Sequence, residues 1–374
     1  MAELDVSLPG RVPAAGPVLD PEFWRDRRVL VTGHTGFKGS WLTLWLQSLG
    51  SRVSGLSCGT PTAPSLYELA RVGEGMAGEV VADLRDFPAV AAAMERFAAE
   101  IVIHMGAQPL VRRSFAEPRE TFETNVMGTV NVLEAMRVGA GVRVAVVVTS
   151  DKCYENREWE WGYREGEPMG GHDPYSSSKG AAELVTAAYR RSFFADEAGP
   201  RVASARAGNV IGGGDWGADR VIPDIARSVR VQRTLHIRNP DSVRPWQHVI
   251  NPLAGYLLLA QELWSRPELA QGWNFGPAEE DARSVRWIVE QVRERWQGQP
   301  AWEHDRVEHP HEARYLKLDS SRARLHLGWR PIVPLDRALD STVAWYREFM
   351  SGADMREVTR SQIDDLARTT APTA

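Results

Sequence analysis

Short apolar runs alternate with longer segments of helical periodicity through the first half of the chain. The apolar runs predict buried strands at residues 29–31, 52–57, 79–82, 101–104, 143–149 and 202–207. The segments between them predict helices at residues 40–49, 89–99, 119–138 and 174–194. Because strands that alternate with helices at this spacing form a parallel sheet with helices on both faces, we predict an α/β fold with a doubly wound parallel sheet.

The pattern becomes less regular after about residue 208. Loops rich in glycine, aspartate and proline separate two further predicted helices, at residues 251–264 and 284–296. Residues 1–20 are rich in proline, glycine and alanine and predict a flexible extension. Residues 351–374 predict a polar tail that contains short helical pieces.

Composition narrows the class of protein. The 374 residues are 43% apolar and 25% charged, with a net charge of −5 and no basic stripe that would favour nucleic acid. The longest aliphatic run, at residues 144–148, is too short to span a membrane, and the N-terminal residues lack the order of a signal peptide. Two cysteines, Cys58 and Cys153, have no metal-binding spacing. We therefore expect a cytoplasmic protein that binds no metal, nucleic acid or membrane.

Three glycines, Gly33, Gly36 and Gly39, lie between the first predicted strand and the first predicted helix. Glycines there allow a tight turn and a close approach of the backbone to a pyrophosphate, which the helix N-terminus then stabilises. The turn predicts a Rossmann dinucleotide site, with a plain strand–helix turn as the alternative. Trp41 and Trp45, four residues apart on the following helix, are predicted to be core residues.

Two further features concern the dinucleotide. Asp83 follows the third predicted strand, where an acid can bond the adenine amino group; capping of the next helix is an alternative that is compatible with this role. The end of the second strand, residues 53–57, lacks the acid that usually reads the ribose 2′-hydroxyl of NAD. His34 and Lys38 lie in the glycine turn instead, so the choice between NAD and NADP stays open.

Tyr175 and Lys179 lie four residues apart on a predicted helix, and therefore on one face of it. A nearby ammonium favours the phenolate, so we expect Lys179 to lower the pKa of Tyr175 from its usual value of about 10. Such a phenol can take a proton from a hydroxyl while hydride leaves the adjacent carbon. A surface helix without chemistry is the alternative interpretation.

Ser150, Asp151 and Lys152 follow the predicted strand at residues 143–149. A neighbouring acid and base suit the elimination of water. Once a carbon is oxidised to a ketone, a base can remove the acidified proton beside it while an acid protonates the departing hydroxyl. A plain ion pair in a loop is the alternative.

The order of glycine turn, strand-end serine and Tyr-x-x-x-Lys resembles the extended short-chain dehydrogenase/reductase family. From about residue 21 to about residue 334, several segments resemble the nucleotide-sugar 4,6-dehydratases of that family, above all those that act on CDP-glucose: residues 23–24, 28–41, 104–114, 124–129, 149–156, 170–179, 206–216, 237–249 and 311–319. The Asp151-Lys152 pair is the specific part, because related dehydratases of dTDP-glucose and GDP-mannose have Asp-Glu there.

The resemblance implies a lyase of deoxysugar biosynthesis with an NAD that is reduced and reoxidised in each turnover. Tyr175, assisted by Lys179 and Ser150, would oxidise C4 of the hexose. Asp151 would protonate the departing C6 hydroxyl, and Lys152 would occupy the place of the C5 base. Lys152 could be that base only if burial or the nearby Lys179 lowers its pKa.

The resemblance also assigns binding residues by position. The cofactor-binding set is Gly33, His34, Gly36, Phe37, Lys38, Gly39, Asp83, Leu84, Ala107, Asn125, Tyr175 and Lys179. The substrate-binding set is Gln108, Asn209, Arg220, Arg244, Asn274 and Tyr315. Arg244 is the best motivated, because a guanidinium can grip a diphosphate with two hydrogen bonds. His104 and His248 are expected to be structural, and Gly106, at a position where alanine is expected, to add only room near the nicotinamide.

The order of the predicted elements indicates how the chain is divided, and the resemblance implies how subunits pair. Residues 21–208 would mainly form the NAD-binding domain with the catalytic residues. Residues 209–350 would mainly form a smaller, mixed α/β domain for the nucleotide sugar, with some elements returning to the sheet. Helices at residues 119–138 and 174–194 would pair between subunits in a homodimer or a dimer of dimers. A dehydratase of another nucleotide hexose, an epimerase or reductase, and a silent binding protein remain alternatives.

Overall fold

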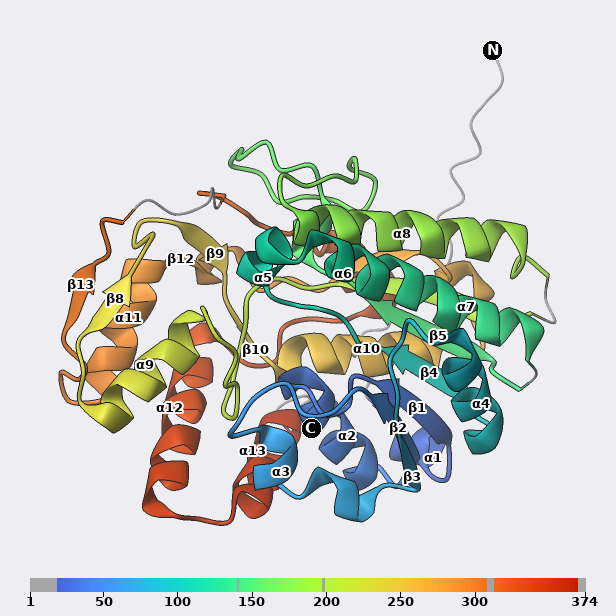
Figure 1. Cartoon of the computed structure of the whole chain (residues 1–374), viewed down its shortest axis with the longest axis horizontal. Coiled ribbons are helices and arrows are strands. Elements are labelled where there is room, and N and C mark those ends of the chain that lie inside the picture. The colour runs from blue at the N-terminus through green and yellow to red at the C-terminus, as the bar shows by residue number, and fades with distance from the viewer. Residues whose placement is uncertain (1–18, 140, 197–198, 308–312, 369–374) are drawn as a thin grey trace.

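The computed structural model describes residues 19–139, 141–196, 199–307 and 313–368. Its centre is a sheet of seven parallel strands in the order β11-β6-β5-β4-β1-β2-β3 (Figure 1). The strands are β1 (Arg28–Thr32), β2 (Arg52–Ser57), β3 (Gly78–Val81), β4 (Ile101–His104), β5 (Val144–Val148), β6 (Arg201–Arg206) and β11 (Gly272–Asn274). From β1 the chain runs outward to β3 and then crosses to β4, which confirms the predicted doubly wound sheet.

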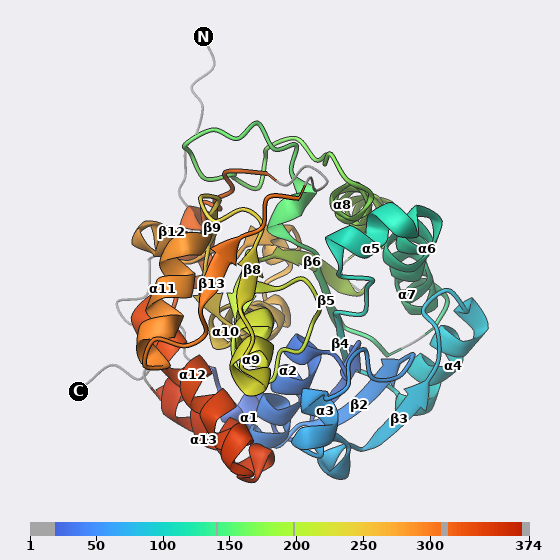
Figure 2. The ribbon, with the colours of Figure 1, turned by 60° about the vertical axis from the view of Figure 1, so that its left-hand side comes forward.

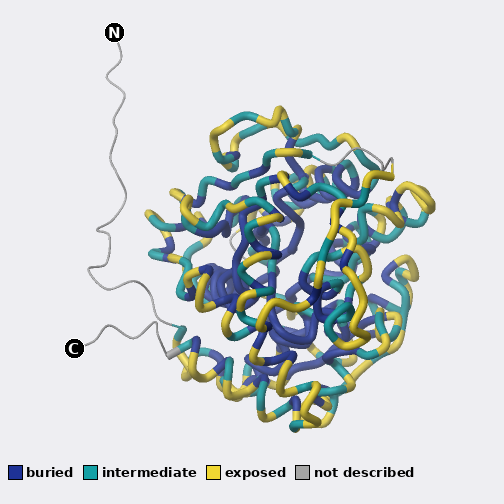
Figure 3. The backbone as a smooth tube through the Cα atoms, turned by 90° about the vertical axis from the view of Figure 1, so that its left-hand side faces the viewer, coloured by how far each residue is buried: buried dark blue, intermediate teal, exposed yellow. Residues whose placement is uncertain are grey.

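Alternate residues of the strands enter two separate cores. Val29 and Val31 pack on one face with α2 (Phe37–Ser48) and α10 (Ile250–Leu263). Leu30 packs on the other face with α4 (Phe87–Phe97) and α7 (Gly128–Val138). Burial on both faces explains why the strand sequences are continuously apolar. Figure 3 shows the buried segments of the backbone in the interior and the exposed ones towards the outside. Within the described part of the chain, no helix is both long and apolar enough to cross a bilayer.

Helix bounds differ little from the predictions. The helix predicted at residues 119–138 is interrupted by a π-helical turn: α6 (Pro118–Phe122), the turn (Glu123–Met127) and α7 follow one another with helical dihedral angles at their junctions. The helix predicted at residues 174–194 is α8 (Pro174–Ser192), which Asp173 caps by accepting a hydrogen bond from the Ser176 amide. Trp41 and Trp45 are buried core residues, as predicted.

The C-terminal half adds short strand pairs and helices beside the sheet (Figure 2). The pairs are β7 (Val210–Ile211) with β10 (Gln247–His248), β9 (Val243–Pro245) with β12 (Ala282–Ser284), and β8 (Leu235–Ile237) with β13 (Trp302–His304). The remaining helices are α1 (Pro21–Trp24), α3 (Leu66–Leu69), α5 (Val111–Ala116), α9 (Val221–Val231), α11 (Val285–Arg295), α12 (Leu335–Ser351) and α13 (Met355–Arg368). Helix α11 was predicted, whereas α9 and α12 were not.

Two predictions concern the ends of the chain: a polar tail at residues 351–374 and a flexible extension at residues 1–20. Residues 351–374 are not simply a polar tail, because α13 buries Met355, Ile363 and Leu366 in the main core. An ion pair of 2.7 Å between Arg71 and Asp354 joins the start of this helix to the N-terminal half. The predicted flexible extension lies outside the described residues except for its last two, of which Asp20 caps α1.

A loop of consecutive glycines, residues 212–214, packs between the two halves. Trp41 of α2 donates its indole N–H to the Gly213 carbonyl at 2.9 Å, and a Cβ atom on Gly213 would lie 1.9 Å from Cγ of Trp345 in α12. Tyr346, the next residue of α12, donates its hydroxyl to the Asp215 carbonyl at 2.5 Å. The C-terminal helices therefore hold the loop that precedes Arg220.

This contact predicts the effect of a single methyl group. Gly213→Ala should lower the free energy of unfolding by about 2 kcal/mol or more, because Trp345 cannot move without disturbing the core. Thermal and urea unfolding followed by tryptophan fluorescence would measure the change. Gly166→Ala is the control, since no atom lies within 4 Å of its added Cβ. Equal stability of the two variants would contradict this account.

Candidate active site

The carboxyl ends of β1, β4 and β5 meet where the strand order reverses, and ligands of such sheets bind at that edge. Gly33 has a φ of +73°, and a Cβ atom there would lie 2.8 Å from the backbone of Gly106. A Cβ on Gly39 would lie 2.1 Å from the Gly33 carbonyl oxygen. The turn is thus packed tightly against the loop after β4. Gly106 does not add open room as expected: its own Cβ would lie 2.6 Å from Leu84 Cδ1.

The N-terminus of α2 is built to receive an anion. Its N-cap, Gly36, makes no side-chain cap, so the first amide groups of the helix have no side-chain acceptor there. Lys38 lies in this first turn. Burial and the nearby Arg220 lower the pKa of Lys38 to about 8, while Asp151 and Asp215 oppose that shift. These features fit the diphosphate of a dinucleotide.

His34 turns its ring into the protein. The ring lies where a side chain on Gly55 would be, 2.5 Å from that residue's Cβ position, and Nε2 lies 2.8 Å from Glu79 Oε1. Burial lowers the pKa of His34 in spite of this carboxylate. The His34 ring bonds Glu79 and packs edge-on to Tyr67, so it supports the glycine turn from inside the protein.

Asp83 lies at the end of β3, in the predicted position. Its carboxylate pairs with Arg85 at 2.6 Å, and that pairing lowers the pKa of Asp83. The alternative role as a helix cap is wrong, because Asp86 caps α4 by accepting from the Ala89 amide at 3.1 Å. Leu84 is buried, and its carbonyl accepts from Asn131 at 2.8 Å.

The predicted catalytic residues come together around the end of β5. Ser150 Oγ donates to Asp151 Oδ1 at 3.0 Å, accepts from the Lys152 amide at 3.2 Å, and is hydrogen-bonded to Tyr175. Asp151 is only 3% exposed, and burial raises its pKa although Lys152 and Ser150 oppose the rise. Asp151 Oδ2 has no hydrogen-bond partner among the described residues. A raised pKa suits a carboxyl group that must carry a proton.

The predicted effect of Lys179 on Tyr175 is not found. Burial raises the pKa of Tyr175 to about 12, because removing the phenolate from water outweighs its hydrogen bond to Ser150. Burial and Lys38 also lower the pKa of Lys179 to about 8, and its ammonium lies 3.4 Å from the Val148 carbonyl. The two residues share a face of α8, but burial dominates both ionisations.

A cleft opens beside this cluster. Lys152 and Arg244 line it, together with Tyr154, His172 and Asn156. Lysine is rare in this chain: of 44 basic residues only four are lysines, namely Lys38, Lys152, Lys179 and Lys317. Three of the four therefore lie at the predicted site. An amine can lose its proton near neutral pH when buried, whereas a guanidinium cannot.

Three predicted binding residues are committed to internal contacts. Gln108 bonds the Leu110 amide and carbonyl and the Thr121 hydroxyl. Asn125 bonds both backbone groups of Gln108 and the Ser178 hydroxyl. Asn274 has no exposed surface, and its amide bonds Tyr154, Tyr163 and Asp319. These internal contacts fix the three side chains, and the binding of substrate by Gln108 and Asn274 and of cofactor by Asn125 stays a prediction.

The other predicted substrate residues lie around the cleft or near it. Arg244 is 6% exposed, lines the cleft and donates to its neighbour's carbonyl at 2.9 Å. Arg220 pairs with Asp215 at 2.9 Å. The Tyr315 carbonyl accepts from Asn156, which lines the cleft, and the Asn209 carbonyl accepts from the Gln247 amide. Phe37 and Ala107 lie in the glycine turn and the loop after β4.

Sequence reasoning missed several residues of the site. Tyr154 and His172 line the cleft, and each lies within a segment that carried the family resemblance. Tyr256 of α10 is fully buried, its hydroxyl has no partner among the described residues, and Asp151 and Tyr175 lie near enough to raise its pKa further. No local pattern indicates Tyr256, because only the tertiary fold brings α10 close to Asp151 and Tyr175.

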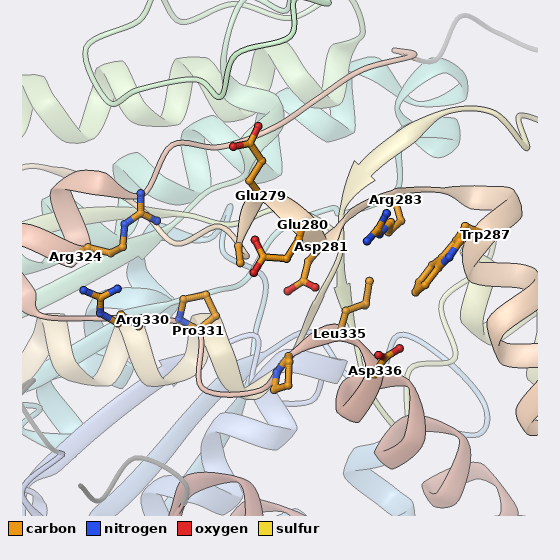
Figure 4. Close-up of a pocket in the computed structure, with 12 residues that line it drawn as sticks. Glu279, Glu280, Asp281, Arg283, Trp287, Arg324, Arg330, Pro331, Leu335 and Asp336 are labelled. Atoms are coloured by element: carbon orange, nitrogen blue, oxygen red, sulfur yellow. The ribbon is translucent and has the colours of Figure 1, made fainter.

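A larger cavity of about 670 Å³ lies elsewhere in the C-terminal half (Figure 4). Glu279, Glu280 and Asp281 line it, opposite Arg324 and Arg330, and no predicted catalytic residue does. Asp281 accepts a hydrogen bond from the backbone at the start of α12, and burial next to Glu280 raises its pKa to about 6. Asp281 thus has a structural contact, and the predicted catalytic residues lie by the smaller cleft and not by this cavity.

A doubly wound parallel sheet, a glycine turn and a Ser–Tyr–Lys cluster at its carboxyl edge define an extended short-chain dehydrogenase/reductase. A profile of one family in that class, described as GDP-mannose 4,6 dehydratase, matches residues 30–342. The chain belongs to that family.

Individual relatives agree. The chain is 50% identical to the CDP-glucose 4,6-dehydratase of Salmonella typhimurium over 358 residues, which cover 94% of this chain and 99% of that protein. Its fold resembles the crystal structure of DesIV, a dTDP-glucose 4,6-dehydratase from Streptomyces venezuelae with NAD and TYD bound, at a TM-score of 0.75 and 25% identity over 88% of this chain and 99% of that one. A UDP-glucose 4-epimerase from Thermotoga maritima has a TM-score of 0.73 at 22% identity over 86% of this chain and 99% of that one, which shows the common fold.

His104 and His248 are buried and make structural contacts, as predicted. His104 Nδ1 lies 2.7 Å from the Thr32 hydroxyl and Nε2 lies 3.2 Å from the Thr129 hydroxyl, and the His248 ring packs edge-on to Trp41. Burial lowers the pKa of each from 6.5 to about 3. Both rings are therefore neutral in the folded protein at any pH above that value.

We expect stability to fall as the pH drops from 6.5 towards 3, because only the unfolded chain takes up these protons in that range. Each histidine should contribute a slope of about 1.4 kcal/mol per pH unit. In His104→Gln the slope between pH 6 and 5, measured by unfolding, should therefore be shallower than in the wild type by about that amount. An unchanged slope would contradict the buried neutral state of His104.

Proposed function

We propose that this protein converts CDP-glucose to CDP-4-keto-6-deoxy-glucose and water, as a lyase of deoxysugar biosynthesis. The observation that carries the proposal is the meeting of Ser150, Asp151 and Tyr175 at the end of β5, where Lys179 reaches the Val148 carbonyl and Lys152 lines the neighbouring cleft. The 50% identity to a CDP-glucose 4,6-dehydratase over nearly the whole of both chains supports the substrate.

The cofactor that we propose is NAD. The close packing of Gly33, Gly39 and Gly106 and the uncapped N-terminus of α2 fit its diphosphate. Bound there, the cofactor would supply an acceptor for the hydride of C4 and a donor of hydride to C6, so that no net reduction would occur. Asp83, Phe37 and the turn around Lys38 would hold the rest of the dinucleotide.

The residues of the chain would move the protons. Because burial raises the pKa of Tyr175 to about 12, only its minor phenolate form, stabilised by Ser150 and the ammonium of Lys179, would take the proton of the C4 hydroxyl. Lys152 would then remove the proton from C5, and Asp151 would give its proton to the C6 hydroxyl, which leaves as water. After C6 is reduced, Lys152 returns a proton to C5, and the proton held by Tyr175 offsets the one that Asp151 lost.

The two halves of the chain would divide these tasks. Residues 21–208 would bind NAD and carry the five catalytic side chains, while residues 209–350 would mainly bind the nucleotide sugar. Arg244 and Arg220 would face the diphosphate, supported by Asn209 and Tyr315. The free thiols Cys58 and Cys153 favour a reducing compartment, and we propose that the protein acts in the cytoplasm.

We also propose a homodimer, with a dimer of dimers as the larger form. Helix α8 packs beside α5, α6 and α7, and apolar side chains stay exposed on these helices (Phe115, Phe122, Val138 and Leu184), in the π-helical turn (Met127) and just after α8 (Phe193). Exposed apolar groups that gather on neighbouring helices favour a protein–protein interface. A second copy presenting the same helices would cover them in a symmetric contact.

The function is tested by incubating the protein and NAD with CDP-, dTDP-, GDP- and UDP-glucose in separate reactions. Mass spectrometry should show loss of one water from CDP-glucose alone, with no accumulation of NADH. Loss of water from another sugar would change the assigned nucleotide, and no mass change with any sugar would overturn the dehydratase.

Two variants make that test specific to the proposed residues. Tyr175→Phe and Lys152→Arg should each lower kcat by about 100-fold or more, because the first removes the acceptor of the C4 proton and the second replaces an amine with a group that cannot act as a base. Both variants should still bind CDP-glucose in calorimetry. Arg25→Lys, at an arginine whose side chain is 60% exposed next to α1, should keep the wild-type rate.

The interface predicts the effect of one charge. Leu184 is 60% exposed on α8, so a carboxylate there costs the isolated subunit little but would be buried in a dimer. Leu184→Glu should therefore halve the mass measured by light scattering at micromolar concentration. A wild type that is already monomeric under these conditions would refute the proposed dimer.

A further inference from the structure

A buried carboxylate lies directly behind the predicted catalytic residues. Glu183 follows Lys179 by one turn of α8 and is only 4% exposed. Its Oε1 accepts from the Thr149 hydroxyl at 2.5 Å, and its Oε2 accepts from the Ser204 hydroxyl at 2.6 Å and from Arg206 Nη2 at 2.7 Å. Both oxygens of the carboxylate are therefore used inside the protein.

Arg206 carries the contacts of Glu183 onward to the cleft. The arginine side chain is 5% exposed, and its Nη1 donates to the Tyr154 hydroxyl at 2.6 Å and to the Glu165 carbonyl at 3.2 Å. Tyr154 in turn donates to Asn274 at 2.7 Å and lines the cleft. One ion pair thus connects α8, the end of β5, strand β6 and the wall of the cleft.

A gain in folding stability does not by itself explain a buried ion pair such as Glu183–Arg206. Two charges that leave water lose much of their hydration, and their attraction often only balances that loss. The position of the pair suggests another role. Thr149 immediately precedes Ser150, Asp151 and Lys152, so a contact from Glu183 to Thr149 fixes those residues against the helix that carries Tyr175.

The negative charge of Glu183 also acts on the ammonium group of Lys179. Burial and Lys38 of α2 lower the pKa of Lys179, whereas Glu183 and the Cys153 thiol oppose this. The charge of Lys179 contributes to lowering the pKa of His104 at the end of β4, so His104 is neutral at neutral pH and adds no charge here. Burial pushes the pKa of Glu183 upward, but Arg206 and the hydrogen bonds from Ser204 and Thr149 hold it below its usual value, and Arg190 also lies nearby. Glu183 is therefore the ionised carboxylate next to Lys179.

We propose that Glu183 is a positioning residue for the reaction: through Thr149 and Arg206 it fixes α8 against the loop of catalytic residues, and its charge keeps Lys179 an ammonium. The role of Lys179 in turnover rests on the proposed function. The charge of Lys179 does not, and it can be measured without substrate.

The small number of lysines makes that measurement direct. Protein labelled with ¹³C at the lysine ε-carbons should give four side-chain signals, and Lys→Arg variants assign them. In Glu183→Gln the Lys179 signal should titrate at a pH lower by about one unit. The alkaline limb of the kcat profile should move the same way, kcat at neutral pH should fall by about 10-fold or more, and KM should change by less than about 2-fold.

Two further variants separate charge from structure. Glu183→Asp keeps the charge but shortens the reach, so it should restore the titration of Lys179 while kcat stays low. Glu134→Gln removes a carboxylate that likewise pairs with an arginine and a hydroxyl, Arg137 and Tyr189, but on α7, and it should change neither readout.

An unchanged Lys179 titration in folded Glu183→Gln would overturn the proposal. If that variant does not fold, a wild-type kcat in Glu183→Asp would overturn it instead. If the wild type dehydrates no nucleotide sugar, the proposed function fails, and the Lys179 titration still decides whether Glu183 maintains its charge.

Discussion

The burial of several ionisable groups together is the constraint on which the site depends. Lys38, Asp151 and Lys179 come from α2, the loop after β5 and α8, and each lies close enough to another to shift its pKa. Charges interact over longer distances when little water separates them. Burial alone would drive all three towards their neutral forms, so the protonation state of each depends on partners supplied by other elements. The three residues therefore behave as one electrostatic unit.

The protein supplies positive charge in two different ways. Arginine provides the fixed charges: Arg206 inside the protein, Arg220 beside Asp215, and Arg244 at the cleft. Lysine, which is rare here, occurs where a group that can lose its proton is useful. This division matches a reaction in which a diphosphate must be held by constant charge while protons move at the hexose.

The C-terminal half is part of the site and of the sheet. Strand β11 extends the parallel sheet, α10 covers one of its faces, and the loop at residues 212–216 is held between Trp41 and Trp345. A ligand at the carboxyl edge of the strands would therefore contact surfaces from both halves. Such packing couples the geometry of the cleft to helices, such as α12, that carry none of the predicted catalytic residues.

Much of this protein can be predicted from its sequence, because some information is local. Apolar runs predict the strands, glycine spacing predicts the turn, and Tyr175, Lys179 and Ser150 to Lys152 stand in recognisable short motifs. The position of Asn274 in a motif does not reveal that Tyr154 and Asp319 form hydrogen bonds with its side-chain amide. The network around Glu183 and the raised pKa of Tyr175 likewise depend on burial and on partners distant in the chain. Only the tertiary structure decides these, because desolvation and hydrogen bonding are properties of the packed neighbourhood and not of neighbouring residues in sequence.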